Sequence, residues 1–327
     1  MEELRKNPTT GQWVLVRPAP APAPGSSDCP FCPGNESLTP SEIAAFRKEG
    51  APPNGPGWSV RVVPECDPFF SIERDLLRVG VGMYDTITPR GASEIVIESP
   101  GHDETPATFS DEQMERLLWM YRDRLIDLKR DAKIRDILIT RRYRKPGARI
   151  AHPYSRVIAT PIVFDAIRRE LTAAREYFRY KRRCVYCDIV REEIAAETRV
   201  LRLTTYFLVV VPYAARCSGE TWIVPRQHGC AFESITPQAA HDLATVFRGY
   251  FGALRESFQD PGYEMVLHTA PNLQSKVLQD DWTTIQEDYH WHIEIVPRPE
   301  RANRVGGFFV SETLPEVTAE ELRNAWL

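Results

Sequence analysis

The chain of 327 residues carries a formal net charge of −4, and 43% of its residues are hydrophobic. A chain of this length and composition can bury at least one sizeable core, and its weak negative charge gives no basic field that would attract nucleic acid or an anionic membrane. We therefore expect a folded globular protein that has neither nucleic acid nor a membrane as a partner.

The amino-terminal stretch, MEELRKNPTTGQWVLV, lacks the apolar core and small-residue cleavage site of a secretory signal, so we expect a cytoplasmic protein. The most apolar run, YFLVVVPY at 206–213, is far shorter than the ~20 residues that cross a membrane and predicts a buried strand. Two Cys-x-x-Cys pairs stand out among the seven cysteines, and in a reducing compartment such pairs favour metal ligands over structural disulfides. The other cysteines, Cys66, Cys217 and Cys230, are expected to be ordinary buried side chains.

The first half contains a Pro/Gly-rich stretch at 19–28, expected to be an exposed loop or extended arm, which is followed by the cysteine pair CPFC at 29–32. The run GASEIVIESPGH has the alternation of a strand and ends at His102. Ser110, with Gln113 three residues on, predicts a capping box for a helix over 111–131, where large apolar residues recur at intervals of three and four. The run HPYSRVIATP at 152–161 then predicts a second strand.

The second half repeats this order from the cysteine pair CVYC at 184–187 onwards. The run SGETWIVPRQH ends at His228 as the earlier strand ends at His102. Thr236, followed by Pro237 at the first helical position, predicts the start of an amphipathic helix over 237–258, on whose exposed side we place His241. The run HWHIEIVPRP at 290–299 closes this copy with another strand.

The two copies together indicate the fold class. Short strands, one long helix in each copy and mostly antiparallel connections predict an α+β fold made of two similar halves. The join lies near 165–183, which divides the chain into residues 1–164 and 165–327.

The cysteine pairs and the repeated histidines predict two zinc sites. Structural zinc takes four sulfur or nitrogen ligands in a tetrahedron, and a Cys-x-x-Cys turn supplies two of them. The repeat adds one histidine from each of the two strands of a copy, so each copy provides four ligands: Cys29, Cys32, His102 and His152 in the first, and Cys184, Cys187, His228 and His290 in the second.

A second arrangement is possible in the second half. Glu170, His268, His290 and His292 could also surround one ion, and His290 cannot comfortably serve both sites. We prefer the cysteine site because it reproduces the first copy.

The motifs together resemble a known family over nearly the whole chain. NPTTGQWVLV, CPFCPGNESLTP, SEIVIESPGHDET, HPYSRVIATP, CVYCDIV, LHTAP and YHWHIEIVPR are similar, in this order, to segments of galactose-1-phosphate uridylyltransferase, a member of the histidine-triad superfamily. The resemblance implies a homodimer with two histidine-triad-like halves, a zinc ion in the first half, and exchange of a uridylyl group between UDP-glucose and a sugar 1-phosphate.

The resemblance also identifies a substitution at the reacting position. The nucleophile of the family is the second histidine of a His-Pro-His-x-Gln strand, and here Tyr154 occupies that position, Arg156 occupies that of the glutamine and His152 is kept. A tyrosine phenol, with a reference pKa of about 10, is almost wholly protonated at pH 7. In the second copy, His292 matches Tyr154 and is a possible alternative nucleophile, although a structural or metal role for it is favoured.

Three arginines lie near this position in the sequence. Arg141, Arg149 and Arg156 are expected to converge on the former phosphate region, where guanidinium groups suit an anionic ligand. They could equally be solvated arginines around a decayed pocket.

These observations leave two functions. The first is a nucleotidyltransferase that moves a nucleotidyl group between a nucleotide sugar and a sugar 1-phosphate. The second is a catalytically inactive or repurposed relative that binds a nucleotide, a sugar phosphate or another anionic ligand.

Overall fold

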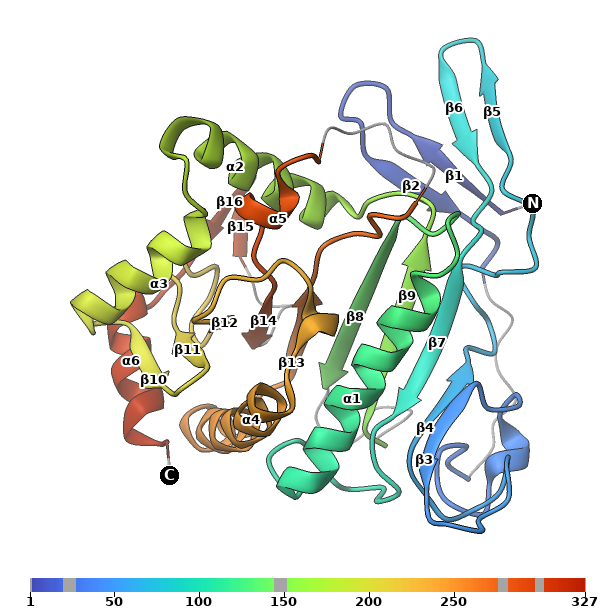
Figure 1. The fold of residues 1–327 in the computed structure, drawn as a ribbon, viewed down its shortest axis with the longest axis horizontal. Helices are drawn as coiled ribbons and strands as arrows, with labels where there is room; N and C mark the ends of the chain where they lie inside the picture. The colour runs from blue at the N-terminus through green and yellow to red at the C-terminus, as the bar shows by residue number, and fades with distance from the viewer. Residues whose placement is uncertain (1, 20–27, 144–151, 276–281, 298–302, 327) are drawn as a thin grey trace.

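The structure is a computed structural model that describes residues 2–19, 28–143, 152–275, 282–297 and 303–326. Its main element is a ten-stranded sheet in which every neighbouring pair is antiparallel (Figure 1). Across the sheet the strands lie in the order β10 (Val200–Leu203), β11 (Phe207–Val210), β12 (Thr221–Pro225), β14 (His292–Pro297), β13 (Tyr263–His268), β8 (Asp136–Tyr143), β9 (Tyr154–Thr160), β7 (Ala92–Ile97), β4 (Trp58–Pro64) and β3 (Ala44–Arg47).

The strand order is mirrored about the pair formed by β8 and β13. On one side follow β9, β7, β4 and β3 from the first half, and on the other side follow β14, β12, β11 and β10 from the second half. The two histidine-bearing strands predicted from the repeat, β9 and β14, therefore occupy equivalent places. This arrangement confirms the predicted α+β fold with two similar halves, while the sheet itself runs without a break from one half into the other.

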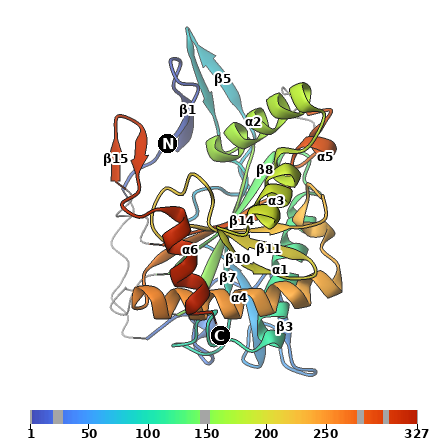
Figure 2. The same cartoon turned by 90° about the vertical axis from the view of Figure 1, so that its left-hand side faces the viewer.

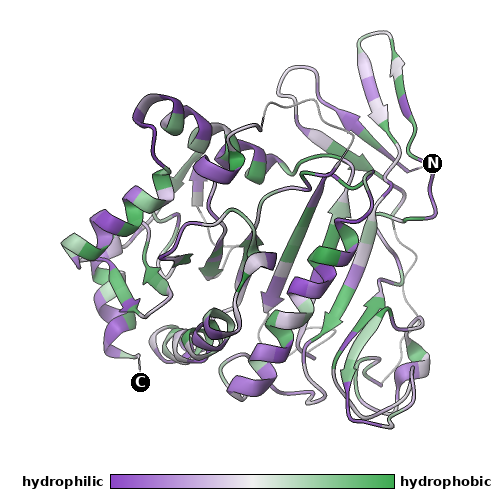
Figure 3. Cartoon of the chain, in the orientation of Figure 1, coloured by the Kyte–Doolittle hydropathy of each residue, from purple (hydrophilic) through white to green (hydrophobic). Residues whose placement is uncertain are grey.

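The helices α1 (Asp111–Leu128) and α4 (Pro237–Phe258) lie side by side on one face of the sheet (Figure 1). Their apolar side chains form one core with Val157 and Ala159 of β9 and with Ile293 and Ile295 of β14. Figure 3 shows hydrophobic and hydrophilic residues alternating along α1, as expected for a helix that buries one side, and α4 buries one side in the same way. Both helices therefore cover the same face of the two halves.

The predicted helix starts are confirmed at both caps. The hydroxyl group of Ser110 accepts from the Gln113 backbone N–H, and that of Thr236 accepts from Ala239. The capping box is only half formed, because the Gln113 amide donates instead to the carbonyl oxygens of Ser59 and Glu98, at 2.8 and 2.5 Å. Gln113 thus ties the helix to the sheet.

Three other helices cover the opposite face of the second half: α2 (Asp165–Lys181), α3 (Val185–Ala196) and α5 (Ile285–Asp288) (Figures 1 and 2). Ile167 and Leu171 of α2 and Tyr186 of α3 pack there with Leu138 of β8 and Trp222 of β12. The main neighbours of β9 among the described elements are instead the strands β7 and β8.

The remaining elements lie outside the main sheet. A four-stranded sheet has the order β2 (Trp13–Val16), β1 (Glu3–Lys6), β6 (Tyr84–Ile87) and β5 (Arg78–Val81), and a hairpin consists of β15 (Asn303–Val305) and β16 (Phe308–Val310). The other short elements are the helix α6 (Pro315–Asn324) and two 3-10 turns, η1 (Glu36–Leu38) and η2 (Phe232–Ser234). No helix in the described ranges has both the length and the apolar character needed to span a membrane.

Candidate functional site

Strand β9 sends alternate side chains to opposite faces of the sheet. Ser155 and Val157 are buried beneath α1, whereas Tyr154 and Arg156 lie on the opposite face of the sheet. Tyr154 and Arg156 are two residues apart in the strand, so they are neighbours on this face. We call the surface formed by Tyr154, Arg156 and Glu65 the β9 face.

Tyr154 is held by the turn that carries the first cysteine pair. Its ring meets the ring of Phe31 edge-on, with centroids 5.6 Å apart, and Phe31 in turn meets the ring of His152. Within the described part of the chain, no hydrogen bond forms to the Tyr154 hydroxyl group. The ring is therefore positioned by packing and the phenol is left without a base beside it.

Arg156 forms an ion pair with Glu65 at 2.9 Å, and Arg17 forms a second with Asp67. Burial raises the pKa of Glu65 above its usual value, while Arg156 opposes that shift. Both guanidinium groups keep buried N–H groups that have no hydrogen-bond partner: Nε of Arg156, and Nε and Nη1 of Arg17. Cys66, which stands between the two carboxylates in the sequence, is exposed, so the expectation that it is buried was wrong.

Arg141 lies on the other side of the sheet, which corrects the prediction that it converges with Arg156. Thr140 is the register partner of Arg156, so the next residue in β8 points towards α1. Arg141 is 3% exposed and donates from Nε to both carboxylate oxygens of Glu98, at 3.0 and 2.8 Å. The third arginine, Arg149, lies outside the described residues.

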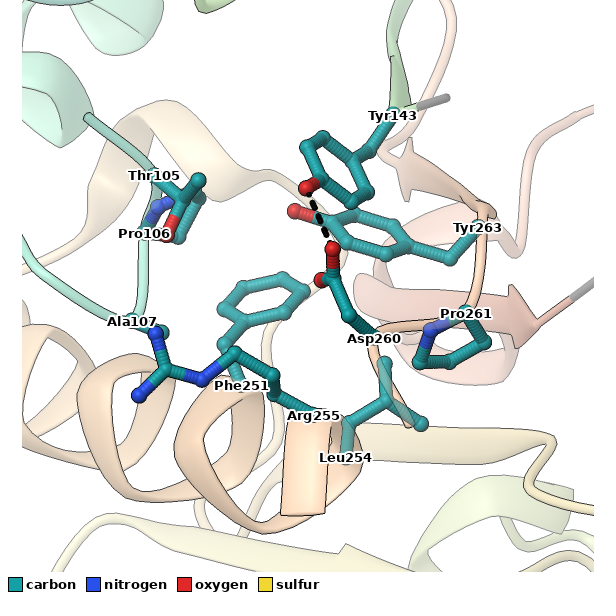
Figure 4. A pocket seen from close by; sticks show the side chains of 10 residues that line it. All are labelled: Thr105, Pro106, Ala107, Tyr143, Phe251, Leu254, Arg255, Asp260, Pro261 and Tyr263. Carbon is teal, nitrogen blue, oxygen red and sulfur yellow. Dashed lines mark hydrogen bonds between the residues drawn. The ribbon is translucent and has the colours of Figure 1, made fainter. Parts of the chain in front are cut away.

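The surroundings of Arg141 confirm that it belongs to the core. Its guanidinium group lies 5.3 Å from the Tyr263 ring centroid, and Tyr143 stacks on Tyr263 (Figure 4). The Tyr143 hydroxyl group donates to Asp260 at 2.9 Å. The cavity that these rings line has a volume of about 20 Å³, which is room for a water molecule and not for a sugar phosphate.

The first cysteine pair meets both predicted histidines. Cys29, Cys32, His102 and His152 have their ligand atoms within 4.8 Å of one another, and we call them the first Cys/His cluster. The Sγ atom of Cys32 lies 3.3 Å from Nδ1 of His102 and 3.8 Å from Nδ1 of His152. The cluster thus connects the cysteine turn with His102, which follows β7, and with His152, which lies two residues before Tyr154.

The ionisation of this cluster suits metal ligands. His152 is buried, and burial lowers its pKa to about 4, so its ring is neutral. Its Nε2 lies 2.7 Å from the carbonyl oxygen of Ser99, which fixes the proton on Nε2 and leaves the Nδ1 lone pair facing the sulfur atoms. Burial also raises the pKa of Cys32 to about 11, a shift that a bound cation would offset.

The second cysteine pair forms an equivalent cluster at the start of α3. Cys184, Cys187, His228 and His290 also lie within 4.8 Å of one another, and we call them the second Cys/His cluster. Sγ of Cys187 lies 3.4 Å from Nδ1 of His228 and 3.7 Å from Nδ1 of His290. Nε2 of His228 lies 2.9 Å from the Gln286 carbonyl oxygen. This contact is equivalent to the one between Nε2 of His152 and the Ser99 carbonyl oxygen.

A third group contains two histidines and two carboxylates: Glu170, His268, His292 and Glu294. Nδ1 of His268 lies 3.0 Å from Glu170, and the His268 and His292 rings stack with centroids 4.6 Å apart. Both rings are buried, and Nε2 of each has no hydrogen-bond partner. We call these residues the Glu/His cluster.

The charges within the Glu/His cluster are arranged unequally. Burial opposes ionisation of Glu170 and His268, but their mutual attraction dominates, lowering the pKa of Glu170 to about 2 and raising that of His268. Burial, together with the nearby His268, lowers the pKa of His292 to about 4. Without a cation the cluster is therefore an ion pair beside a neutral imidazole.

These positions resolve the choice that the sequence left open for His290. The structure places His290 with the cysteines, and Glu294 stands in the Glu/His cluster where His290 was the alternative. The reason is the strand: β14 begins at His292, so His292 and Glu294 share one face, whereas His290 precedes the strand. His292 is 1% exposed, which removes it as an alternative nucleophile because no substrate can reach it.

Two acidic residues of the site, Glu65 and Glu294, were not among the ligands that the sequence analysis selected. Glu294 follows His292 at the two-residue spacing of a strand, and this alternation could have identified it as a ligand. The pairing of Glu65 with Arg156 has no such signal in the spacing, because it joins segments 91 residues apart through β4 and β7.

Comparison with known proteins gives similarity along the whole chain. No model of a known protein family matches the chain. The ADP-glucose phosphorylase of Arabidopsis thaliana is 28% identical over 347 residues, which cover 99% of this chain and 93% of the relative. The galactose-1-phosphate uridylyltransferase of Thermotoga maritima is 26% identical and covers 99% of this chain and 98% of the relative.

Solved structures show the same similarity in three dimensions. A uridylyltransferase structure superposes with a TM-score of 0.82 at 28% identity, covering 100% of this chain and 98% of that one. The crystal structure of the Arabidopsis thaliana ADP-glucose phosphorylase with bound ADP-glucose superposes with a TM-score of 0.74 at 27% identity, covering 99% of both chains.

Proposed function

We propose that this chain, a member of the galactose-1-phosphate uridylyltransferase and ADP-glucose phosphorylase family, transfers a nucleotidyl group from a nucleotide sugar to a phosphate oxygen of an acceptor. The acceptor is a sugar 1-phosphate or inorganic phosphate. The observation that carries this proposal is the end-to-end similarity in sequence and fold to enzymes of both kinds.

The β9 face is where we place the reacting phosphate. Arg156 is half-buried and is oriented by Glu65, which suits the planar, charge-assisted recognition of a phosphoryl group. Tyr154, at the position of the family nucleophile, can donate a hydrogen bond from its phenol. Arg149 remains a proposed substrate ligand from its place in the sequence, whereas Arg141 is assigned to the core.

We propose zinc in both Cys/His clusters. Tetrahedral Zn²⁺ with ordinary bond lengths separates a sulfur ligand from a nitrogen ligand by about 3.6 Å. The four measured Sγ to Nδ1 distances run from 3.3 to 3.8 Å, so the side chains already fit such an ion. With four protein ligands and no open position, each zinc would be structural, and the first would fix the start of β9.

We propose a metal ion in the Glu/His cluster as well. Two buried imidazole nitrogen atoms without partners face two carboxylates, and such an arrangement is costly unless a cation or a proton is shared among them. The Arg216 guanidinium group, 2.6 Å from Glu294, and the Tyr289 hydroxyl group, 3.0 Å from Glu170, hold the two carboxylates in place. Metal analysis of the purified protein would then give three metal ions per chain, of which two are zinc.

We further propose a cytoplasmic homodimer. Two unbridged Cys-x-x-Cys pairs fit a reducing compartment. Large apolar side chains are exposed on two hairpins, at Val81 (67%) and Met83 (69%) beside β5, and at Phe308 (79%) of β16, and contact with a second copy would cover them. Light scattering after gel filtration would give twice the chain mass.

The experiment that tests the function is a pair of assays on zinc-loaded protein. One supplies UDP-glucose with galactose 1-phosphate, and the other supplies ADP-glucose with inorganic phosphate. Release of glucose 1-phosphate in either assay supports the proposal, and its absence in both would refute it.

The second candidate, an inactive anion-binding relative, is favoured by Tyr154 at the reacting position. It predicts no turnover in either assay but a raised Tm in the presence of the nucleotide sugar, because binding to the folded state alone stabilises it. The Arg156→Gln variant would lose that shift.

A further inference from the structure

None of the seven histidines of the chain presents a free ring nitrogen at the β9 face. A neutral imidazole has one nitrogen lone pair with which it can attack phosphorus. In four histidines Nδ1 faces a cysteine sulfur atom: His102, His152, His228 and His290. A second copy of the same chain would bring no others.

The remaining three histidines are equally unsuited. His268 and His292 are 3% and 1% exposed within the Glu/His cluster, so neither meets a substrate. His241 lies on α4, with Nδ1 2.6 Å from Glu115 of α1. Both helices cover the face of the sheet opposite to Tyr154. An imidazole therefore cannot receive the nucleotidyl group at the β9 face.

The β9 face instead offers binding groups. Among the described residues, no base lies within hydrogen-bonding distance of the Tyr154 phenol, so this group is available as a hydrogen-bond donor. Arg156, whose side chain is 40% exposed, pairs with Glu65, and Arg17 pairs with Asp67 next to it. Two guanidinium groups can hold two phosphate groups at the same time and reduce the repulsion between them.

We propose that transfer at this site is a single displacement in which Arg156 binds the transferred phosphoryl group and no side chain is nucleotidylated. This inference rests on the proposed function. An oxygen of the acceptor phosphate forms a bond to the α-phosphorus while the bond from that phosphorus to the bridging oxygen breaks. The electron pair leaves with the sugar 1-phosphate, and since both are phosphate anions no proton has to move.

The test mixes unmodified, zinc-loaded protein in equal amount with a nucleotide sugar labelled at the α-phosphorus, with the acceptor left out. We expect no release of glucose 1-phosphate and an unchanged intact mass, followed by steady turnover once galactose 1-phosphate or inorganic phosphate is added. Release of one equivalent of glucose 1-phosphate together with labelling of the protein, on Tyr154, Cys66 or any other residue, would overturn this inference. The proposed function would not be affected by that result. No turnover with either acceptor would refute the proposed function, and the inference with it.

The configuration at phosphorus gives an independent measurement. With an α-thio nucleotide sugar of known configuration, a single displacement inverts the α-phosphorus and two successive displacements retain it. Inversion is the expected result, and retention would contradict the inference whatever the mass spectrum shows.

Variants separate binding from covalent roles. Tyr154→Phe removes one hydrogen-bond donor, and we expect kcat to fall by about tenfold or less, whereas loss of a nucleophile would abolish turnover. Arg156→Gln should lower kcat by about 100-fold, with partial recovery in Arg156→Lys, which keeps the charge. Arg116→Gln, on the exposed side of α1, is the matched control and should leave kcat unchanged.

Discussion

The buried pair of Arg141 and Glu98 gives the sharpest test of how the arginines divide between core and site. Arg141→Met keeps much of the side-chain volume but removes both hydrogen bonds to a carboxylate that is 0% exposed. Within the described residues, the donors left to the Glu98 carboxylate would be the hydroxyl groups of Ser155 and Tyr121. Breaking one partner of such a buried pair costs about 3–5 kcal/mol.

The expected change in Tm follows from the chain length. With an unfolding entropy of about 2.1 cal/mol/K per residue, the 327 residues give about 0.7 kcal/mol/K, so the variant should unfold about 4–7 °C lower. The double variant Arg141→Met/Glu98→Gln should recover part of this loss, because no buried charge is left without its partner.

The assay compares thermal unfolding and turnover of Arg141→Met with those of Arg156→Met. We expect Arg141→Met to lower Tm and, well below that Tm, to change kcat/KM by less than about threefold. We expect Arg156→Met to keep its Tm within about 1 °C of the unmodified protein and to lose about 100-fold in kcat/KM. If Arg141→Met instead left Tm unchanged and abolished turnover, Arg141 would be a substrate ligand and the assignment of the two faces of β9 would be wrong.

Three further predictions concern metal content and pH. Cys29→Ser and Cys184→Ser should each remove one zinc per chain, measured by atomic emission, and a variant that kept both ions would contradict its cluster. Glu294→Gln should lose the third metal ion and keep both zinc ions, and unchanged metal content would remove the Glu/His site. Burial raises the pKa of Asp136 to about 7, so between pH ~4 and 7 the folded state holds a proton that the unfolded state has released. The stability that this proton contributes is complete below pH ~4 and is lost as the pH rises to 7. Asp136→Asn should flatten this fall in denaturant titrations by up to about 1.4 kcal/mol per pH unit, and an unchanged slope would show that Asp136 is ionised.

Much of the fold could be predicted from the sequence because the same order of motifs occurs in both halves of the chain. The capped helices at 111–128 and 237–258 follow from their apolar spacing, and the matching strands follow from alternation and from the position of each histidine. The first Cys/His cluster shows why a repeat is informative: Cys29 and His152 are far apart in the chain, yet the same four residue types recur in the same order in the second half.

The sequence was less informative about where single side chains point. It left His290 open between two clusters, and it grouped Arg141 with Arg156 although their strands turn them to opposite faces. It gave no sign of Glu65 beside Arg156, since that pair is created by strands that meet only in the folded sheet.

The sequence by itself therefore predicted the repeated architecture and which histidines lie with each cysteine pair, and the resemblance placed Tyr154 at the position of the family nucleophile. Only the tertiary structure decided which arginine faces solvent and which cluster contains His290. The physical reason is that successive residues of a strand point to opposite faces, so the side on which a residue lies depends on a pairing register that distant segments establish together.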